Sequence, residues 1–216
     1  MFLFLILKIK GKVIPVTEDV ANLMMELTDG NILIGENSIN HADIQTKGIT
    51  SLYFQNNVRI NPHASEAIER ADTIIIGPGN IYCSILPNLI TEGFKEAIAK
   101  TGATIILPIN LTNKKDHTHS WKVSTYVQTI EKELGRKVDY IIVNNQQIET
   151  ELIEHYTSKE GDGVLVYNDM EDSRIILSPI LSEEKTTQTG ADAIAHTRSF
   201  IRHDSDKLAQ AILSLP

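Results

Sequence analysis

The sequence predicts an α/β protein: a doubly wound, mostly parallel β-sheet with helices on both faces, preceded by a β-hairpin region. Three observations support this prediction. From residue 63 onward, short apolar runs alternate with stretches of helical period. The apolar runs are almost entirely Ile, Val and Leu, as in parallel strands that are covered on both faces. Before residue 63, apolar runs flank Asp29-Gly30, a dipeptide that favours a tight hairpin turn.

The first 60 residues are expected to form the β-rich part. The opening MFLFLIL is apolar throughout but far shorter than the roughly 20 residues that span a bilayer. It has no basic segment before it and no cleavage site of small residues, so a signal peptide is not predicted and we expect a buried strand or helix. Further short strands are expected at residues 13–16, on both sides of Asp29-Gly30, and in ITSLYFQ, residues 49–55.

Residues 61–216 are expected to hold the alternating strands and helices, in one domain with the first part. The predicted strands cover residues 72–77, 103–110, 139–144, 163–167 and 174–181. The predicted helices cover residues 63–71, 89–102, 124–135, 147–157 and a last amphipathic helix with Ser205 as its N-cap. Residues 182–193 are predicted to be a loop. Strand–helix–strand units join parallel strands by right-handed crossovers, so the expected sheet is Rossmann-like.

Composition excludes several classes of protein. The chain has 28 acidic and 20 basic residues, a formal net charge of −8, and no Lys/Arg block beyond scattered pairs such as Lys114-Lys115. A nucleic-acid partner is therefore not expected, because phosphate backbones are bound by clustered positive charge. We also expect no membrane association. The single cysteine, Cys83, excludes an internal disulfide, suits a reducing cytoplasm, and is interpreted as a small core residue.

The segment ADTIIIGPGNIYCSILPN, residues 71–88, is the first candidate site. Its apolar run stops at Gly77, Pro78, Gly79 and Asn80, and a strand that ends in glycines has either a tight turn or a close ligand. Residues 110–113 and 144–145 lie at the ends of two further predicted strands. In open parallel sheets, ligands lie beyond the carboxyl ends of the strands, where the winding reverses. The neutral groups there suit sugars, bases and phosphate oxygens; alternatively, they only form turns.

Other residue patterns are weaker indications of a functional site. Asp116, His117 and His119 include a His-x-His pair in a predicted loop, but no Cys or further His is clustered with it, so no metal site is predicted. Arg202-His203-Asp204 precedes the last helix and is interpreted either as a capping and charge-pairing cluster or as a ligand contact. No Gly-x-Ser-x-Gly motif occurs, and the catalytic residues, if any, stay unassigned.

Residues 71–98 resemble the family that joins 2-phospho-L-lactate transferase (CofD) and the gluconeogenesis-factor-like proteins (YvcK). The family pattern reads approximately AD-x-I-I-x-GPGS-x-Y-T-S-I-x-PN-L-L. The segments GKVIPVT, DGNILIGENSI and IRHDSDKLAQAI are similar to the same family, in the same order, so the resemblance covers nearly the whole chain.

The resemblance implies a ligand-binding loop and the residues that form it. Asn80 matches the transferase form of the motif, whereas Tyr82 and Asn88 match the gluconeogenesis-factor form. The implied ligand-facing loop consists of Gly77, Pro78, Gly79, Asn80, Tyr82, Ser84 and Pro87.

A second loop, NLTNKKDHTHSWKVSTYV, keeps the family's Asn110, Thr118 and Ser124. The chain departs from the pattern at His117, where the family has an acid, and at Thr125-Tyr126, where it has Asp-His. These departures put catalysis in doubt, because an acid lost from a magnesium or phosphate site changes the charge of that site.

The family begins with a glycine-rich nucleotide loop and a further segment before the point where this chain starts, and no G-G-G-T-G occurs in the 216 residues. Such a loop holds a diphosphate with its backbone amides. We therefore expect this chain to correspond to the carboxyl-terminal part of a family member, to bind uridine-diphosphate sugars poorly on its own, and to pair with a missing amino-terminal half or with a second copy.

The resemblance implies two functions. The first is a cytoplasmic protein that binds a nucleotide or nucleotide-sugar and regulates carbon metabolism, cell-wall growth and cell shape; Tyr82 and Asn88 favour it. The second is a magnesium-dependent 2-phospho-L-lactate transferase of deazaflavin cofactor biosynthesis, an activity that loss of the amino-terminal part could abolish. No other cofactor is implied.

Overall fold

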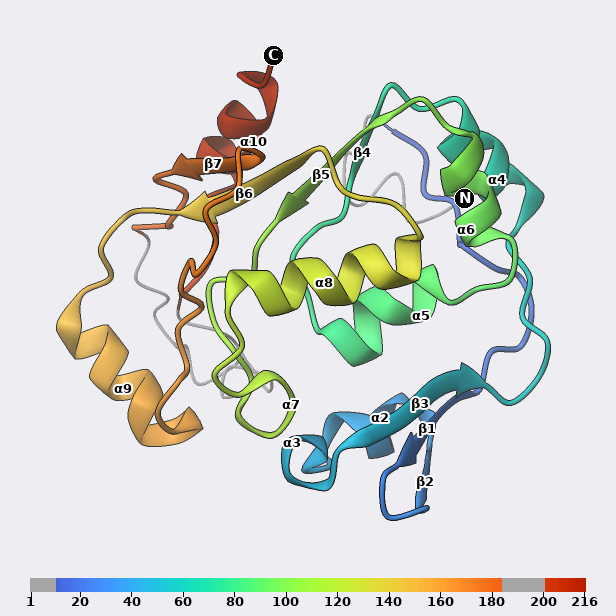
Figure 1. Cartoon of the computed structure of the whole chain (residues 1–216), viewed down its shortest axis with the longest axis horizontal. Helices are drawn as coiled ribbons and strands as arrows, with labels where there is room; N and C mark the ends of the chain where they lie inside the picture. Colours follow the sequence, from blue (N-terminus) through green and yellow to red (C-terminus); the bar gives the residue numbers. More distant parts are fainter. Residues whose placement is uncertain (1–10, 184–200) are drawn as a thin grey trace, which may run out of the picture.

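The computed structural model describes residues 11–183 and 201–216 and contains two sheets (Figure 1). A three-stranded antiparallel sheet has the order β2-β1-β3, with β1 at Leu23–Leu27, β2 at Ile32–Ile34 and β3 at Ile49–Phe54. A four-stranded parallel sheet has the order β4-β5-β6-β7, with β4 at Thr73–Ile75, β5 at Thr104–Pro108, β6 at Tyr140–Asn144 and β7 at Ile175–Ser178.

The amino-terminal hairpin forms where the sequence predicts it. β1 and β2 pair in antiparallel register across a turn in which Gly30 has φ 82° and the Asp29 carboxylate accepts from the Asn31 backbone N–H at 3.0 Å. Glycine takes this positive φ at little cost, and an Asp side chain closes such turns. Two short helices, α2 (Gly35–Asn40) and α3 (Ile44–Lys47), follow the hairpin and are not evident from the sequence.

Helices lie on both faces of the parallel sheet, as predicted. Its helices are α4 (Pro62–Glu69), α5 (Leu86–Leu89), α6 (Phe94–Lys100), α7 (Lys115–Thr118), α8 (Val123–Leu134), α9 (Thr150–Glu160) and α10 (Ser205–Leu213), and a π-helical turn, η1 (Ile81–Ile85), leads into α5. Because side chains alternate along a strand, Ile105 and Ile141 face α8, whereas Ile106 and Ile142 pack with α10.

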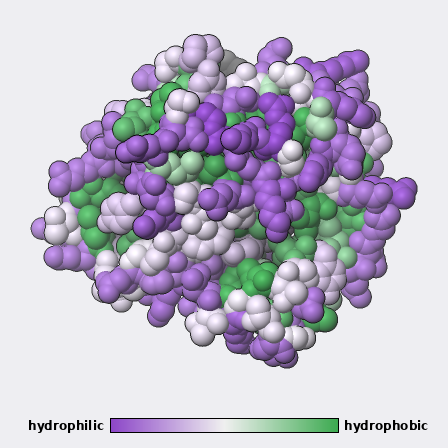
Figure 2. Space-filling model, viewed as in Figure 1, coloured by the Kyte–Doolittle hydropathy of each residue, from purple (hydrophilic) through white to green (hydrophobic). Residues whose placement is uncertain are grey.

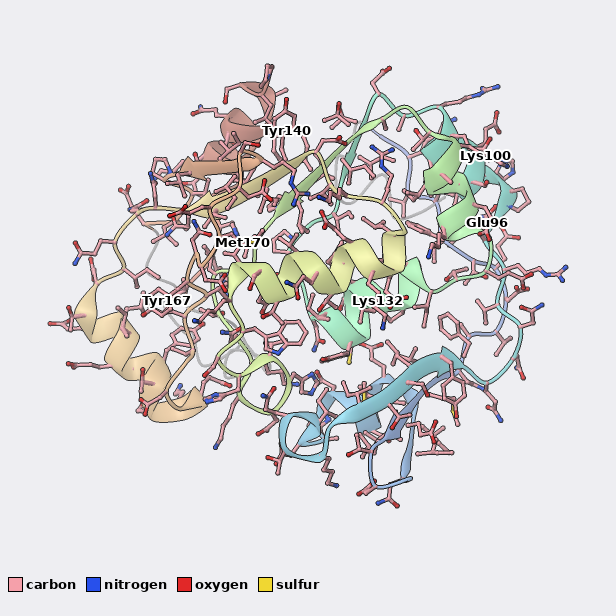
Figure 3. All side chains as sticks on the ribbon, in the orientation of Figure 1. Glu96, Lys100, Lys132, Tyr140, Tyr167 and Met170 are labelled. Carbon is pink, nitrogen blue, oxygen red and sulfur yellow. The ribbon has the colours of Figure 1, made fainter. Side chains whose placement is uncertain are left out.

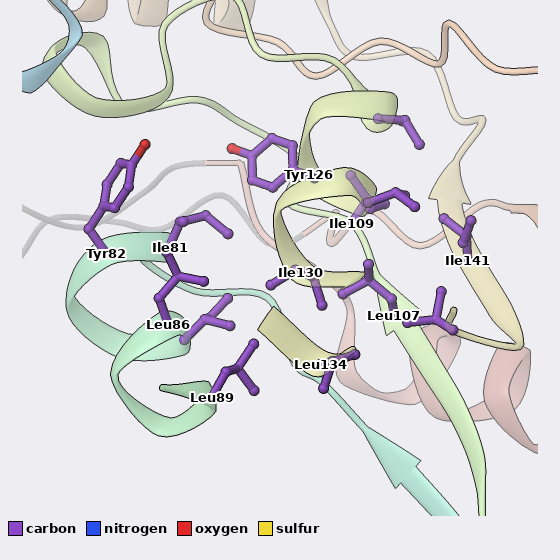
Figure 4. Close-up of a cluster of buried hydrophobic side chains, with 14 of the residues drawn as sticks. Ile81, Tyr82, Leu86, Leu89, Leu107, Ile109, Tyr126, Ile130, Leu134 and Ile141 are labelled. Carbon is purple, nitrogen blue, oxygen red and sulfur yellow. The ribbon is translucent and has the colours of Figure 1, made fainter. Parts of the chain in front are cut away.

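The main core lies between the η1–α5 segment and α8, over β5 and β6 (Figure 4). Ile81, Leu86 and Leu89 meet Ile130 and Leu134 there, and all five are buried. Leu23, Met25 and Leu27 of β1 belong to the same hydrophobic cluster, so the antiparallel sheet packs against this core.

Several predicted elements are wrong in position or kind. Residues 13–16 form no strand; Pro15 has no N–H for a ladder, although the Val16 carbonyl accepts one bond from the Asn61 N–H. Residues 163–167 form only an isolated bridge, between Thr112 and Leu165, beside the left-handed Gly161 and Gly163.

Two helix boundaries also differ from the prediction. The helix predicted at 89–102 is divided, since Gly93 at φ 90° separates α5 from α6. The N-cap of α10 is Asp204 rather than Ser205, and its carboxylate accepts from the N–H groups of Asp206 and Lys207.

The predictions for MFLFLIL and for most of the loop at 182–193 lie outside the described residues. None of the described helices has the length and apolar composition needed to cross a bilayer. On the face shown in Figure 2, hydrophilic residues predominate and hydrophobic residues form separate patches.

Candidate functional site

The loops after β4 and β5 meet at the carboxyl edge of the parallel sheet. The Asn110 side chain joins them, because its Oδ1 accepts from the Gly79 N–H at 3.3 Å and its Nδ2 donates to the Gly79 carbonyl at 2.9 Å. The GPGN segment therefore lies at the carboxyl end of a parallel strand, where the sequence predicts it.

A cavity of about 320 Å³ opens beside this junction, which we call the Lys114 cavity. Four residues proposed from the sequence line it: Gly79, Asn80, Asn110 and Thr118. The others that line it are Ile81, Thr112, Asn113, Lys114 and His117. The structure thus brings the first and second loops of the sequence analysis to one site.

The side chain of Asn80 is engaged within the fold. Its Oδ1 accepts from the N–H groups of Tyr82 and Cys83, both at 3.1 Å, and so caps η1. Its Nδ2 donates to Asn40 Oδ1 at 3.1 Å. Of the two interpretations given for the strand ends, ligand contact or turn formation, the Asn80 side chain therefore follows the second.

Gly77 and Gly79 are not required by local geometry. Neither has a positive φ, the conformation that would demand glycine. A Cβ at Gly77 would have nothing within 4 Å in the described structure, and a Cβ at Gly79 would meet only ordinary contacts, the nearest at 3.6 Å to Ile85. The space beside these two glycines would allow a ligand to approach the backbone closely.

Lys114 supplies positive charge to the cavity. Its Nζ donates to the backbone and side-chain oxygens of Asn40, the latter at 2.8 Å, and lies 3.3 Å from His117 Nε2. All three partner atoms are neutral, and no ion pair of the described residues includes Lys114. Burial lowers the pKa of Lys114. A half-buried cation without a carboxylate favours an anionic ligand.

His117 lies beneath Lys114 and is 2% exposed. Its Nδ1 is buried without a hydrogen-bond partner. Burial, and then the Lys114 charge, lower the pKa of His117 to about 4, so its imidazole is neutral at pH 7. The Tyr82 ring lies 5.9 Å from the His117 ring between centroids, and burial raises the pKa of Tyr82 to about 12.

Thr118 holds the second loop in shape. Its Oγ1 accepts from the Lys114 N–H at 3.0 Å and lies 3.3 Å from the Tyr126 hydroxyl oxygen. The same hydroxyl donates to Asn113 Oδ1 at 2.9 Å, and Asn113 Nδ2 donates to the backbone oxygens of Trp121 and Gly163. Burial raises the pKa of Tyr126 to about 12, so it stays a neutral donor. This buried network fixes the loop that carries Lys114.

The other residues proposed from the sequence lie elsewhere. Tyr82 is buried in the core, Ser84 and Asn88 are exposed on η1 and α5, and Asn88 Nδ2 donates to the Ser84 carbonyl at 2.6 Å. Ser124 lies in the first turn of α8 and bonds the Asp169 carboxylate. The residues that do not line the Lys114 cavity are Gly77, Pro78, Tyr82, Ser84, Pro87, Asn88 and Ser124. Sequence reasoning missed Lys114 as a site residue and gave no role to Asn40.

Among residues 11–183 and 201–216, no group of three His, Cys, Asp or Glu side chains is placed to hold a metal ion, so Asp116, His117 and His119 do not form one. His203 Nε2 lies 3.1 Å from the Ile109 carbonyl, and burial lowers the pKa of His203. Cys83 is partly buried rather than a full core residue, and burial, with the charge of Glu36, raises the pKa of its thiol to about 11.

Comparisons with known proteins support the fold and identify the family. The family model described as "2-phospho-L-lactate transferase CofD" matches residues 3–210. A "Putative gluconeogenesis factor" of Thermotoga maritima is 36% identical over 209 residues, which are 96% of this chain and 63% of that protein. A "Gluconeogenesis factor" of Listeria innocua is 31% identical over 212 residues, 97% of this chain and 61% of that protein.

A solved structure, described as a member of the UPF0052 family from Bacillus halodurans, superposes with a TM-score of 0.80 at 27% identity. The match covers 98% of this chain and 64% of that one. The chain therefore spans less than two thirds of the length of these relatives. On the extent of the family match and on these relatives, the chain belongs to the CofD family, which the gluconeogenesis factors share.

Proposed function

We propose that the protein binds a nucleotide-sugar in the cytoplasm and regulates carbon metabolism and cell-wall growth, and with it cell shape. The observation that carries the binding proposal is Lys114, whose charge faces neutral atoms at the carboxyl edge of the sheet. The regulatory part rests on the name "gluconeogenesis factor" carried by relatives. Because the chain spans only part of those proteins, their whole activity is a proposal for this one.

The chemistry of the Lys114 cavity suits a phosphate. An anion near Lys114 Nζ would compensate a charge that burial now penalises, and it would displace the longest of its contacts, the one to His117 Nε2 at 3.3 Å. The open backbone at Gly79, which lines the cavity, would let the ligand approach closely. A nucleotide-sugar carries such phosphates between two uncharged ends.

Calorimetry with a panel of uridine-diphosphate sugars tests this function. We expect binding weaker than micromolar, because the 216 residues lack a glycine-rich diphosphate loop. Lys114→Met should lower the affinity about tenfold or more, the loss of one charge-assisted contact of about 1.4 kcal/mol. The matched control is Lys115→Met, because Lys115 is exposed and does not line the cavity. Equal affinities for the two variants would refute the phosphate site.

The alternative is a 2-phospho-L-lactate transferase, which the family description favours. His117 is not placed to act as its base, because in the neutral imidazole Nε2 accepts from Lys114 Nζ and the buried Nδ1 therefore carries the proton. The described lining residues provide amide and hydroxyl oxygens without a carboxylate, a poor set for the magnesium ion this reaction would use. Transfer of a phospholactyl group to a deazaflavin hydroxyl, assayed with magnesium, would establish this function in place of the first.

A further inference from the structure

A second cavity, of about 280 Å³, lies at the carboxyl ends of β5 and β6, and we call it the Gln146 cavity. Asn110 lines both this cavity and the Lys114 cavity. The segment 163–167 closes one wall, held by hydrogen bonds from the Val166 N–H to the Leu111 carbonyl and from the Asn113 N–H to the Val164 carbonyl. The two cavities therefore adjoin through one side chain, at the edge where sheets of this class bind ligands.

The Gln146 cavity is apolar and uncharged. Its aliphatic lining consists of Ile109, Leu111, Val143, Ile148, Ile153, Leu165 and Val166. Its polar groups are the amide side chains and the hydroxyls of Thr150 and Tyr167, and none of its described lining residues carries a charge. This composition contrasts with the Lys114 cavity, and it suits an uncharged part of a ligand.

Gln146 lines this cavity and carries an unpaired hydrogen-bond acceptor. Its Oε1 is buried and has no partner. Its backbone is fixed by Asn144, which donates from Nδ2 to the Gln146 carbonyl at 2.8 Å and accepts at Oδ1 from the Gln146 N–H at 3.3 Å. Buried acceptors in native proteins are nearly always paired, so a pinned and unpaired one calls for a donor.

Tyr167 provides an aromatic surface at the cavity. It is 61% exposed, although its backbone carbonyl accepts from the Val123 N–H at 3.1 Å and anchors it to the start of α8. Figure 3 shows Tyr167 between α9 and α8, in the segment that leads to β7. An exposed aromatic ring on a held backbone is a suitable platform for stacking.

We propose that the Gln146 cavity binds the nucleobase of the ligand, with a ring N–H donating to Gln146 Oε1 and Tyr167 stacking on the ring. The proposal rests on the function proposed above, because it places the base on one side of Asn110 and the phosphates at Lys114 on the other. One ligand would then occupy both cavities, with its uncharged base in the Gln146 cavity and its phosphates in the Lys114 cavity.

A base fits this cavity better than the sugar of the same ligand. A hexose carries hydroxyl groups around its whole ring, and each one buried against the aliphatic wall without a partner would cost about 1–3 kcal/mol. A nucleobase is flat, weakly hydrated on its faces and polar only at its edge. That distribution matches aliphatic walls with amides at one side.

The test uses nucleosides, which carry no phosphate and so do not depend on Lys114. Uridine and guanosine are titrated into the 216-residue chain, and backbone amide signals are followed by NMR. We expect shifts concentrated at residues 144–148 and 165–167, from at least one nucleoside. Methylation of its ring N–H, in N3-methyluridine or N1-methylguanosine, should weaken binding about tenfold, since Gln146 Oε1 would lose its donor. Shifts produced there by glucose but by neither nucleoside would overturn the proposal in favour of a sugar.

Two variants complete the test. Gln146→Leu and Tyr167→Ala should each weaken nucleoside binding at least fivefold, while Gln128→Leu, an exposed glutamine on α8, should leave it unchanged. If Lys114→Met weakens binding of the uridine-diphosphate sugars but both cavity variants bind them normally, the base site is refuted and the phosphate site stands. If nucleosides bind at Gln146 while no nucleotide-sugar responds to Lys114→Met, the phosphate site fails and the base site stands.

Discussion

Asn80 and Lys114, both at the carboxyl edge of the sheet, have different roles: one stabilises the fold, and the other provides a positive charge to the cavity. Both polar atoms of the Asn80 carboxamide form hydrogen bonds within the protein. The oxygen accepts from N–H groups of η1, and the nitrogen donates to Asn40. Lys114 also contacts Asn40, but it forms no ion pair with any of the described residues. Asn40 comes from α2 and lies 74 residues from Lys114 in the chain. The antiparallel part of the molecule therefore helps to position the only cation that lines the Lys114 cavity among the described residues.

Asn80→Ala should destabilise the protein. It removes the acceptor that caps η1 and the contact to Asn40, and loss of such a cap costs about 1–2 kcal/mol. Urea denaturation measures the change in the free energy of unfolding. Asn88→Ala is the control, because Asn88 is exposed and, among the described residues, its side chain bonds only the Ser84 carbonyl; its cost should be about half as large or less. An Asn80→Ala protein of unchanged stability and lost nucleotide-sugar affinity would instead make Asn80 a ligand contact.

His117 should make stability depend on pH. Its folded pKa of about 4 lies below the ordinary value of 6.5, so the unfolded chain binds more protons between these two values. The contribution is complete above pH 6.5 and is lost as the pH falls toward 4, up to about 3 kcal/mol at about 1.4 kcal/mol per unit. His117→Gln should flatten this slope in urea denaturation, whereas His63→Gln, at an exposed site, should not. Part of the slope should persist in His117→Gln, because the pKa of His203 is lowered too.

At the scale of elements, the long apolar strands and amphipathic helices could be predicted from sequence, and the short elements could not. β5, β6 and α8 follow from apolar runs and helical period, because packing and local preference agree there. α2 and α3 have six and four residues, too few for a helical period to be recognised. The strand predicted at 163–167 is limited by two left-handed glycines nearby, and its apolar side chains are used to cover α9 instead.

The cap of α10 gives a direct comparison of neighbouring residues. Asp204→Ala should lower the free energy of unfolding by about 1 kcal/mol, because Asp204 accepts from the N–H groups of Asp206 and Lys207. Ser205→Ala should change it by less than about 0.5 kcal/mol, since Ser205 is the first residue within the helix. Thermal unfolding followed by circular dichroism distinguishes them. The reverse order would restore Ser205 as the cap.

At the scale of the whole molecule, the two sheets share one hydrophobic cluster. Met25 and Leu27 of β1 belong to it with Ile105 and Ile141 of the parallel sheet, and all four are at most 1% exposed. The sequence predicts a single domain from length and composition, but the residues joining the sheets lie far apart in the chain and no local pattern pairs them. The contact between Asn40 and Lys114 could not be predicted for the same reason, because the two residues are 74 positions apart in the chain.

The shared core predicts cooperative unfolding of both sheets. Met25→Ala should cost about 2–5 kcal/mol, the range for a fully buried side chain, and should accelerate amide hydrogen exchange equally in β1 and in β5. Met24→Ala is the control on the same strand, because Met24 faces the other side and should cost less. Faster exchange confined to the antiparallel sheet would show two domains.

The aromatic rings beside His117 have a practical consequence. Trp121 is the single tryptophan of the chain, and its ring lies 6.1 Å from Tyr82 and 5.2 Å from Tyr126 between centroids. Tyr82 in turn contacts the His117 ring, which lines the Lys114 cavity. The indole emission of this protein therefore originates from Trp121 alone, and the Tyr82 ring lies between Trp121 and the His117 ring that lines the cavity. Changes in its intensity or wavelength would report occupancy of that cavity and protonation of His117 with no label attached.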